Sequence, residues 1–177
     1  MKTTTENTSS VKAKAFCEHC NSMPQEQIES SQPFEDIFIR ETMVSYVHSD
    51  QTLFKIAEPS DIAQFVRSIL TDNSREHFVA MFLDAMNQVT AYSIVSIGSA
   101  NHAIVTPREV FQRAIVAGAI SIVIAHNHPS GSTLPSNEDR MVTKRLSESG
   151  SLLGIKLLDH VIVSDSEYYS FSAAGVL

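Results

Sequence analysis

The sequence predicts an α/β protein with a mixed central sheet flanked by helices. Beyond about residue 54, the patterns follow the order helix, strand, strand, helix, strand, helix, strand. One of these segments, residues 119–125, has a single hydroxyl and no charge, which is typical of a strand buried on both faces. The chain of 177 residues is 43% hydrophobic, which suits one domain with a real core plus a tail.

The first predicted helix follows Pro59, and Ser60 is its expected N-cap. Its apolar residues recur at helical spacing and form one stripe: Ile62, Phe65, Val66, Ile69 and Leu70. A strand over residues 76–84 and a second over residues 88–98 follow, and Asn87 marks the turn between them.

The second predicted helix begins with the residues of a capping box. Thr106 is the expected N-cap, Pro107 occupies the first helical position, and Glu109 is the acid at the third. The residues expected to face inward are Val110, Phe111, Ala114 and Ile115. His102, in the preceding loop, is expected to be exposed to solvent.

The third predicted helix runs from Asn137 to about Ser149, and Gly150 is expected to follow its end. The residues expected to face inward are Met141, Val142 and Leu146.

The last predicted elements are a strand over residues 155–163 and a closing strand over residues 168–177. Asp159 and His160 interrupt the apolar pattern of the first of these strands. We interpret them as a buried, hydrogen-bonded pair, with a contact to substrate as the alternative.

The N-terminal part of the chain differs in composition. Residues 1–33 are rich in Thr, Ser, Glu, Gln and Asn, which predicts a flexible tail. Cys17 and Cys20 form a Cys-x-x-Cys pair, but the sequence has no second pair, so reduced thiols are preferred over a metal or redox site. Residues 34–53 alternate in part and predict a strand extension packed on the domain, which spans residues 54–177.

Composition also limits the partners. The net charge of −7 argues against a broad electropositive surface, so direct binding of nucleic acid is not expected. No apolar run is long enough to span a bilayer, and the N-terminus lacks the apolar segment of a secretory signal. With only two cysteines, the chain is expected in the cytoplasm, and the sequence leaves formation of a homo-oligomer open.

The residues with the clearest chemistry follow the buried strand over residues 119–125. His126 and His128 are two apart at its carboxyl end, so their imidazoles should point the same way. Two prolines and a glycine then predict a loop, and Ser136 opens a helix with Asp139 in its first turn. Two histidines and one carboxylate, with a fourth position left to water, are the ligands of a catalytic zinc site.

Other interpretations of these residues need no metal. Ser136 and Asp139 fit a helix cap, and two histidines in a loop can simply be solvated. The cap and the metal site are compatible, because the cap would fix the backbone of Asp139. A zinc deaminase is disfavoured, because its His-x-Glu and Pro-Cys-x-x-Cys pattern is absent.

The spacing of His126, His128, Ser136 and Asp139 resembles the JAMM motif of JAB/MPN-type zinc metallopeptidases. The string His-Asn-His-Pro-Ser-Gly, with Pro-Ser-x-x-Asp after it, is similar to the RadC-type branch. The similarity continues in three further segments, which are residues 96–98, 106–111 and 154–162. It implies the JAB/MPN architecture, a cytidine-deaminase-like α/β sandwich. Full-length RadC-type proteins also contain a segment resembling helix-hairpin-helix elements, which is not found here, so a short JAB-only member is expected.

The resemblance implies one Zn²⁺ per chain, held by His126, His128 and Asp139. It also implies hydrolysis of a peptide or isopeptide bond in a peptide or protein substrate. Glu76 matches the glutamate that lies by the zinc-bound water in this family, as the general base. The Ser136 hydroxyl matches the group that helps to stabilise the oxyanion.

Two alternatives remain open. Glu109 is the rival of Glu76 for the general base, although its capping position explains it without catalysis. A non-catalytic or DNA-repair-associated binding module with a retained metal site is the alternative to an enzyme, although retention of all four motif residues argues against a scaffold that has lost its site.

Overall fold

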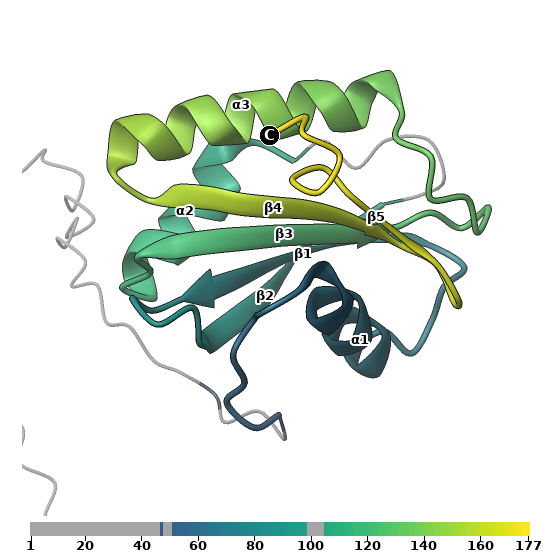
Figure 1. Ribbon diagram of the computed structural model, residues 1–177, viewed down its shortest axis with the longest axis horizontal. Coiled ribbons are helices and arrows are strands. Elements are labelled where there is room, and N and C mark those ends of the chain that lie inside the picture. The colour runs from purple at the N-terminus through teal and green to yellow at the C-terminus, as the bar shows by residue number, and fades with distance from the viewer. Residues whose placement is uncertain (1–46, 48–50, 99–104) are drawn as a thin grey trace, which may run out of the picture. The chain divides into compact units, whose positions relative to one another are not determined.

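The central sheet has five strands in the order β2-β1-β3-β4-β5, with β3 and β4 parallel and the other neighbours antiparallel (Figure 1). The computed structural model describes residues 47, 51–98 and 105–177, all within one compact unit, Val44–Leu177. The strands are β1 (Glu76–Leu83), β2 (Val89–Gly98), β3 (Ser121–Asn127), β4 (Lys156–Val163) and β5 (Tyr168–Ser170). The predicted mixed sheet is therefore confirmed.

Helices cover both faces of this sheet. They are α1 (Pro59–Ile69), α2 (Pro107–Val116) and α3 (Asn137–Leu153). α1 lies against one face, and α2 and α3 lie against the other (Figure 1). Each face has its own hydrophobic cluster, because successive side chains of the buried strand β3 point to opposite faces. Ile124 belongs to the α2 and α3 side, and Val123 to the α1 side.

The helix starts follow local capping chemistry. At α2 the prediction is confirmed, since the Thr106 hydroxyl accepts a hydrogen bond from the Glu109 backbone N–H. At α1 the predicted cap was two residues too late: Glu58 is the N-cap and Ser60 is already helical. Pro59 sets the first helical residue, and the Asp61 carboxylate accepts a 2.9 Å bond from the Glu58 N–H.

The end of α3 was predicted wrongly. The helix continues past Gly150 to Leu153, and Gly154, at φ 71°, is the left-handed residue that ends it. Gly150 is instead buried in the helix, where its lack of a side chain lets the Ile155 carbonyl approach closely. Two residues predicted to face inward are exposed, Met141 on α3 and Ile115 on α2.

A register shift lies where β4 begins to pair with β3. Ile122 pairs with Leu157 but Val123 pairs with Asp159, so β4 contains one additional residue at this point. The alternation of side chains is displaced by one position beyond it. His160 therefore pairs with Ile124 and faces the α2 and α3 side of the sheet.

The chain closes differently from the prediction after β4. β5 is only three residues long, and turns follow it, with Phe171 fully buried. Among the described residues, no helix has the length and apolar character to cross a bilayer. The predictions for Cys17, Cys20, His102 and most of residues 34–53 lie outside the described residues.

Candidate metal centre

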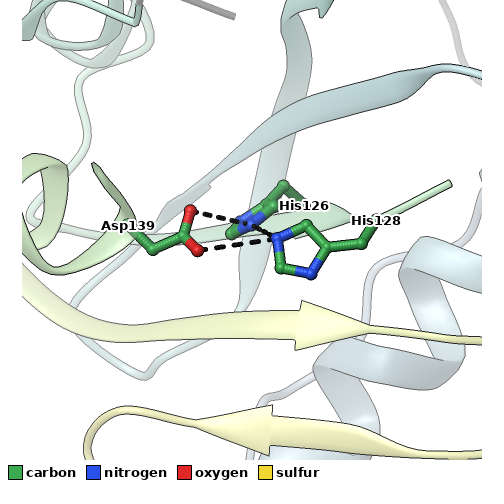
Figure 2. Close-up of side chains that lie close together, drawn as sticks. All are labelled: His126, His128 and Asp139. Carbon is green, nitrogen blue, oxygen red and sulfur yellow. Dashed lines mark hydrogen bonds and ion pairs between the residues drawn. The ribbon is translucent and has the colours of Figure 1, made fainter. Parts of the chain in front are cut away.

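The predicted metal ligands meet at the carboxyl end of β3. Nε2 of His126 lies 3.0 Å from Nε2 of His128 and 3.1 Å from Oδ1 of Asp139. Nε2 of His128 lies 3.5 Å from Oδ2 of Asp139. Figure 2 shows the three side chains pointing toward one another, and one ligand atom from each lies within 4.8 Å of the others.

The backbone elements explain this meeting. His126 is the penultimate residue of β3 and is fully buried, whereas His128 follows the strand and its side chain is 18% exposed. Asp139 lies in the first turn of α3, with 12% of its side chain exposed. The loop between His128 and Asp139 therefore brings the start of α3 to the end of β3, at a place that is still partly exposed to solvent.

The cap of α3 orients the carboxylate of Asp139. The Ser136 hydroxyl donates a 2.6 Å hydrogen bond to Oδ2, and the Ser136 backbone N–H donates a second of 2.7 Å. In return, the Ser136 oxygen accepts from the Asp139 N–H. Because Oδ2 already receives two hydrogen bonds, Oδ1 is the oxygen with lone pairs left for another partner. The role of Ser136 as an oxyanion donor stays a prediction.

A buried chain of hydrogen bonds fixes the proton on His126. The Thr143 hydroxyl has one proton, and it must donate this proton to the carbonyl of Asp139 at 2.6 Å, because a carbonyl only accepts. Nδ1 of His160, 2.6 Å from the same hydroxyl, is therefore the donor to Thr143. With its proton on Nδ1, neutral His160 accepts at Nε2, so Nδ1 of His126 donates to it at 2.8 Å.

The second histidine is held in the same tautomer by a simpler contact. Nδ1 of His128 lies 2.8 Å from the carbonyl oxygen of Ser132, so this nitrogen is the donor. The lone pair of His128 is therefore on Nε2, as it is for His126. The neutral rings present both lone pairs to the same point in space.

These residues fit a metal ion. Two imidazole lone pairs and one carboxylate oxygen converge, and none of these three acceptors brings a proton of its own to share. Such a set is stabilised by a cation. Two nitrogen ligands and one oxygen ligand, with one side left accessible, are typical of catalytic rather than structural zinc sites.

The same contacts shift the pKa values. The hydrogen bond with Asp139 raises the pKa of His128, against a smaller opposing effect of burial. Burial alone would raise the pKa of Asp139, but the close contacts of its carboxylate with the His126 and His128 rings hold it well below its usual range. Burial, followed by repulsion from His126, holds the pKa of His160 well below its ordinary value. A metal ion and a proton therefore compete for Nε2 of His128.

Glu76 lies on the face of the sheet that contains the ligands. Phe78 pairs with His126 across β1 and β3, and their rings stack with centroids 5.9 Å apart. Glu76 is two residues earlier, so its side chain points to the same face and the register continues toward His128. Its charge also contributes to the raised pKa of His128, after the contribution of Asp139. Its role as general base stays a prediction.

The rival acid, Glu109, is occupied elsewhere. Oε2 of Glu109 accepts a hydrogen bond of 3.1 Å from the Thr106 N–H and one of 3.2 Å from the Thr106 hydroxyl. These bonds belong to the cap of α2, which agrees with the structural interpretation of this acid.

Thr143 and Asn127 were not identified from the sequence, and His160 was predicted as a buried partner of Asp159 or a substrate contact, not as a neighbour of a metal ligand. A usable signal existed for Thr143, which is four residues after Asp139 and so lies on the same side of α3. For His160 the signal was obscured by the register shift in β4. The predicted pairing of Asp159 with His160 holds only for the His160 backbone N–H, because the Asp159 carboxylate otherwise accepts from Ser170 and Ser172.

A cleft of about 220 Å³ opens beside His128. It lies between α1 and the ends of β3 and β4. Its lining combines apolar and polar residues, among them Val66, Leu70, Pro129, Val163, Asn73 and Asp165. A cleft of this kind next to a candidate reactive centre can hold part of an extended ligand.

Comparisons with known proteins identify the family of the domain. Residues 56–176 match the RadC-like JAB domain. A UPF0758 protein of Trichlorobacter lovleyi is 44% identical over 127 residues, which are 72% of this chain and 55% of the relative. A UPF0758 protein of Bacillus licheniformis is 48% identical over 124 residues, 70% of this chain and 55% of the relative.

A UPF0758 protein of Methanosarcina mazei is 44% identical over 121 residues, which are 68% of this chain and 53% of the relative. The chain thus spans about half the length of the curated relatives it matches. The matched segment includes the whole sheet, all three helices and every residue of the metal centre. The chain belongs to the RadC-like JAB domain family.

Proposed function

We propose that this chain is a zinc-dependent hydrolase of the JAMM type that cleaves a peptide or isopeptide bond. The observation that carries the proposal is the convergence of Nε2 of His126, Nε2 of His128 and the Asp139 carboxylate at the carboxyl end of β3, where His128 and Asp139 are partly exposed. Three protein ligands and an open side suit catalysis, because a substrate must reach the metal. The absence of cysteine from this set favours zinc in a catalytic rather than a structural setting.

The residues around the ligands supply the remaining chemistry. Bound zinc would make water acidic near neutral pH and polarise the carbonyl to be cleaved. The Glu76 carboxylate, on the same face of the sheet as His126, takes up the proton of the attacking water and returns it to the leaving amine. A positioned base of this kind typically contributes about 100- to 10,000-fold.

Ser136 is assigned to the oxyanion. Its hydroxyl donates to Oδ2 of Asp139 in this structure, and it would turn toward the substrate oxygen as negative charge develops there. Its backbone N–H can continue to hold Oδ2 during this change, because that bond is independent of the hydroxyl rotamer. The carboxylate thus keeps its orientation while the hydroxyl moves.

The substrate is a peptide or protein. The cleft beside His128 is long enough to border both α1 and the end of β4, and its mixed lining suits a polypeptide segment with apolar and polar side chains. Asp165 and the Asn73 amide, joined by a 2.8 Å hydrogen bond, form part of its polar lining.

The test combines metal analysis with turnover. The protein loaded with one equivalent of Zn²⁺ is incubated with a fluorogenic peptide library and with lysine-linked isopeptide conjugates. We expect cleavage by the wild type and its loss in Glu76→Gln at unchanged zinc content. Zinc binding without any cleavage in either series would favour the binding module, and absence of zinc binding would contradict both.

A further inference from the structure

We propose that His160 is a positioning residue of the metal centre, which fixes the tautomer and ring orientation of His126 and, through Thr143, couples that ligand to Asp139. The inference rests on the proposed metal site but concerns residues outside the motif. His160 touches no substrate position described above, and its effect is exerted through His126.

A continuous chain of hydrogen bonds joins two of the candidate ligands. From Nδ1 of His126 the path passes to His160 at 2.8 Å, to Thr143 at 2.6 Å and to the Asp139 carbonyl at 2.6 Å. The ends of this path are a ligand on β3 and the backbone of a ligand on α3. The metal would close the ring on its other side by binding both side chains.

The donor and the acceptor of every hydrogen bond on this path are fixed. The Asp139 carbonyl cannot donate, so Thr143 must, and each donor along the path is then determined up to Nδ1 of His126. No exchange with water relaxes this order, because His126 and His160 are fully buried and Thr143 is 3% exposed. Among the described residues, no buried side-chain polar atom lacks a partner.

The ring of His160 is also held sterically. It stacks on Phe171 with centroids 4.7 Å apart and an interplanar angle of 8°, and it lies 5.8 Å from the ring of Phe78. Rotation of the imidazole would break both hydrogen bonds and the stacking. His160 is therefore a rigid acceptor aimed at Nδ1 of His126.

Loss of this acceptor has a specific consequence. Without it, the proton of His126 can move to Nε2, where it satisfies Asp139 at 3.1 Å and blocks the lone pair that a metal needs. Removal of such an outer partner typically costs about 10- to 100-fold in metal affinity. A residue that served only packing would lower the stability of the fold without this effect on affinity.

The test measures Zn²⁺ affinity of the full chain by competition with a chromophoric chelator, and the stability of the metal-free form by thermal unfolding. His160→Phe keeps an aromatic ring on Phe171 and removes the acceptor, whereas His160→Gln restores an acceptor and a donor. Thr143→Val removes only the next member of the path at the same size. Phe171→Leu is the matched control, because it removes the stacking partner and leaves every hydrogen bond of the path.

We expect His160→Phe to weaken Zn²⁺ binding by about 10- to 100-fold. His160→Gln should recover most of this loss, and Thr143→Val should show a smaller loss. Phe171→Leu should lower the unfolding temperature and weaken Zn²⁺ binding much less than His160→Phe, because both hydrogen bonds of His160 remain. In ¹⁵N spectra of the imidazoles, His126 should be protonated on Nδ1 in the wild type and lose this preference in His160→Phe.

Wild-type affinity in His160→Phe, or an equal loss in Phe171→Leu, would overturn the inference. If His160→Phe does not fold, Thr143→Val and the ¹⁵N spectrum of the wild type decide, and wild-type affinity in Thr143→Val with His126 protonated on Nε2 would overturn it. A wild-type chain that binds no Zn²⁺ would instead overturn the proposed function itself, and this inference with it.

Discussion

The side-chain oxygen of Asn127 accepts a 2.8 Å hydrogen bond from the backbone N–H of His77, fifty residues earlier in the chain. The amide nitrogen of Asn127 donates a 3.0 Å bond to the carbonyl of Arg75. These two bonds hold the backbone of the residues before and after Glu76. The residue between the two histidine ligands thus also holds the start of the strand that supplies the proposed base.

The first prediction compares Glu76→Gln with Glu109→Gln. Glutamine is nearly the same size as glutamate but is a very poor base, so Glu76→Gln should keep its zinc and stability while turnover falls by at least ~100-fold. Glu109→Gln should weaken the cap of α2 by roughly 1 kcal/mol or less and leave the rate per folded molecule unchanged. Metal analysis, thermal unfolding and turnover are measured on both. The opposite pattern would make Glu109 the base.

The second prediction concerns the ligands. His126→Ala and Asp139→Ala should each abolish stoichiometric binding of Zn²⁺, because each removes one of three converging ligand atoms. Glu138→Ala is the control, since this neighbouring acid in the first turn of α3 is exposed and outside the set. Elemental analysis after dialysis measures the content. Zinc content at the wild-type level in Asp139→Ala would exclude the proposed site.

The third prediction uses the raised pKa of His128. In the metal-free protein, the bond with Asp139 stabilises the protonated ring, so wild type should exceed His128→Gln in stability most below about pH 6.5. This advantage should disappear as the pH rises through the raised pKa of the folded state. With saturating Zn²⁺ the trend should reverse, since the metal needs the neutral ring. Unfolding measured between pH 5 and 8 avoids the titration of Asp139, whose folded pKa is well below its usual range.

The fourth prediction is that Gly150→Ala destabilises the fold. A methyl group at this position of α3 would collide with the Ile155 carbonyl and lie 3.1 Å from the ring of Phe111. We expect a loss of about 1–3 kcal/mol in the free energy of unfolding. For an exposed glycine in a helix, the same change would instead raise the free energy of unfolding by up to about 1 kcal/mol. The sign of the measured change therefore distinguishes a buried from an exposed position. Ser151→Ala, one residue later and exposed, should change the stability by less than about 0.5 kcal/mol.

The fifth prediction concerns residues 1–33. A shortened chain that begins at Phe34 should remain folded and keep one equivalent of Zn²⁺, because the removed residues offer little apolar surface to bury. Circular dichroism and metal analysis measure this. Loss of a second equivalent of zinc in Cys17→Ser of the full chain would show that the Cys-x-x-Cys pair binds metal after all.

The parts of the site that lie close together in the sequence could be predicted from it. His126 and His128 are two residues apart at the end of one strand, and Ser136 and Asp139 form a cap, so local geometry alone constrains each pair. The buried strand β3 was predictable from its uniform apolar composition. Its neighbours were predictable as strands, but no local pattern states which of them pairs with it.

The contacts that the sequence did not reveal depend on such pairing. His160 reaches His126 only because β4 lies beside β3 with a one-residue register shift, and without this shift the alternation would place Asp159 there instead. Gly150 was misplaced for a similar reason. A glycine near the end of a helical pattern suggests a cap, and only the packing against Ile155 shows why it lies inside the helix.

The two histidine ligands differ in the backbone that holds them, and this difference sets the route of a metal ion. His126 belongs to an interior strand that is hydrogen-bonded on both sides, so its displacement requires the sheet to separate. His128 lies just beyond the strand, in a loop whose contact with Ser132 is local. We expect ions to enter and leave on the time scale of this loop, while His126 keeps its place from one ion to the next.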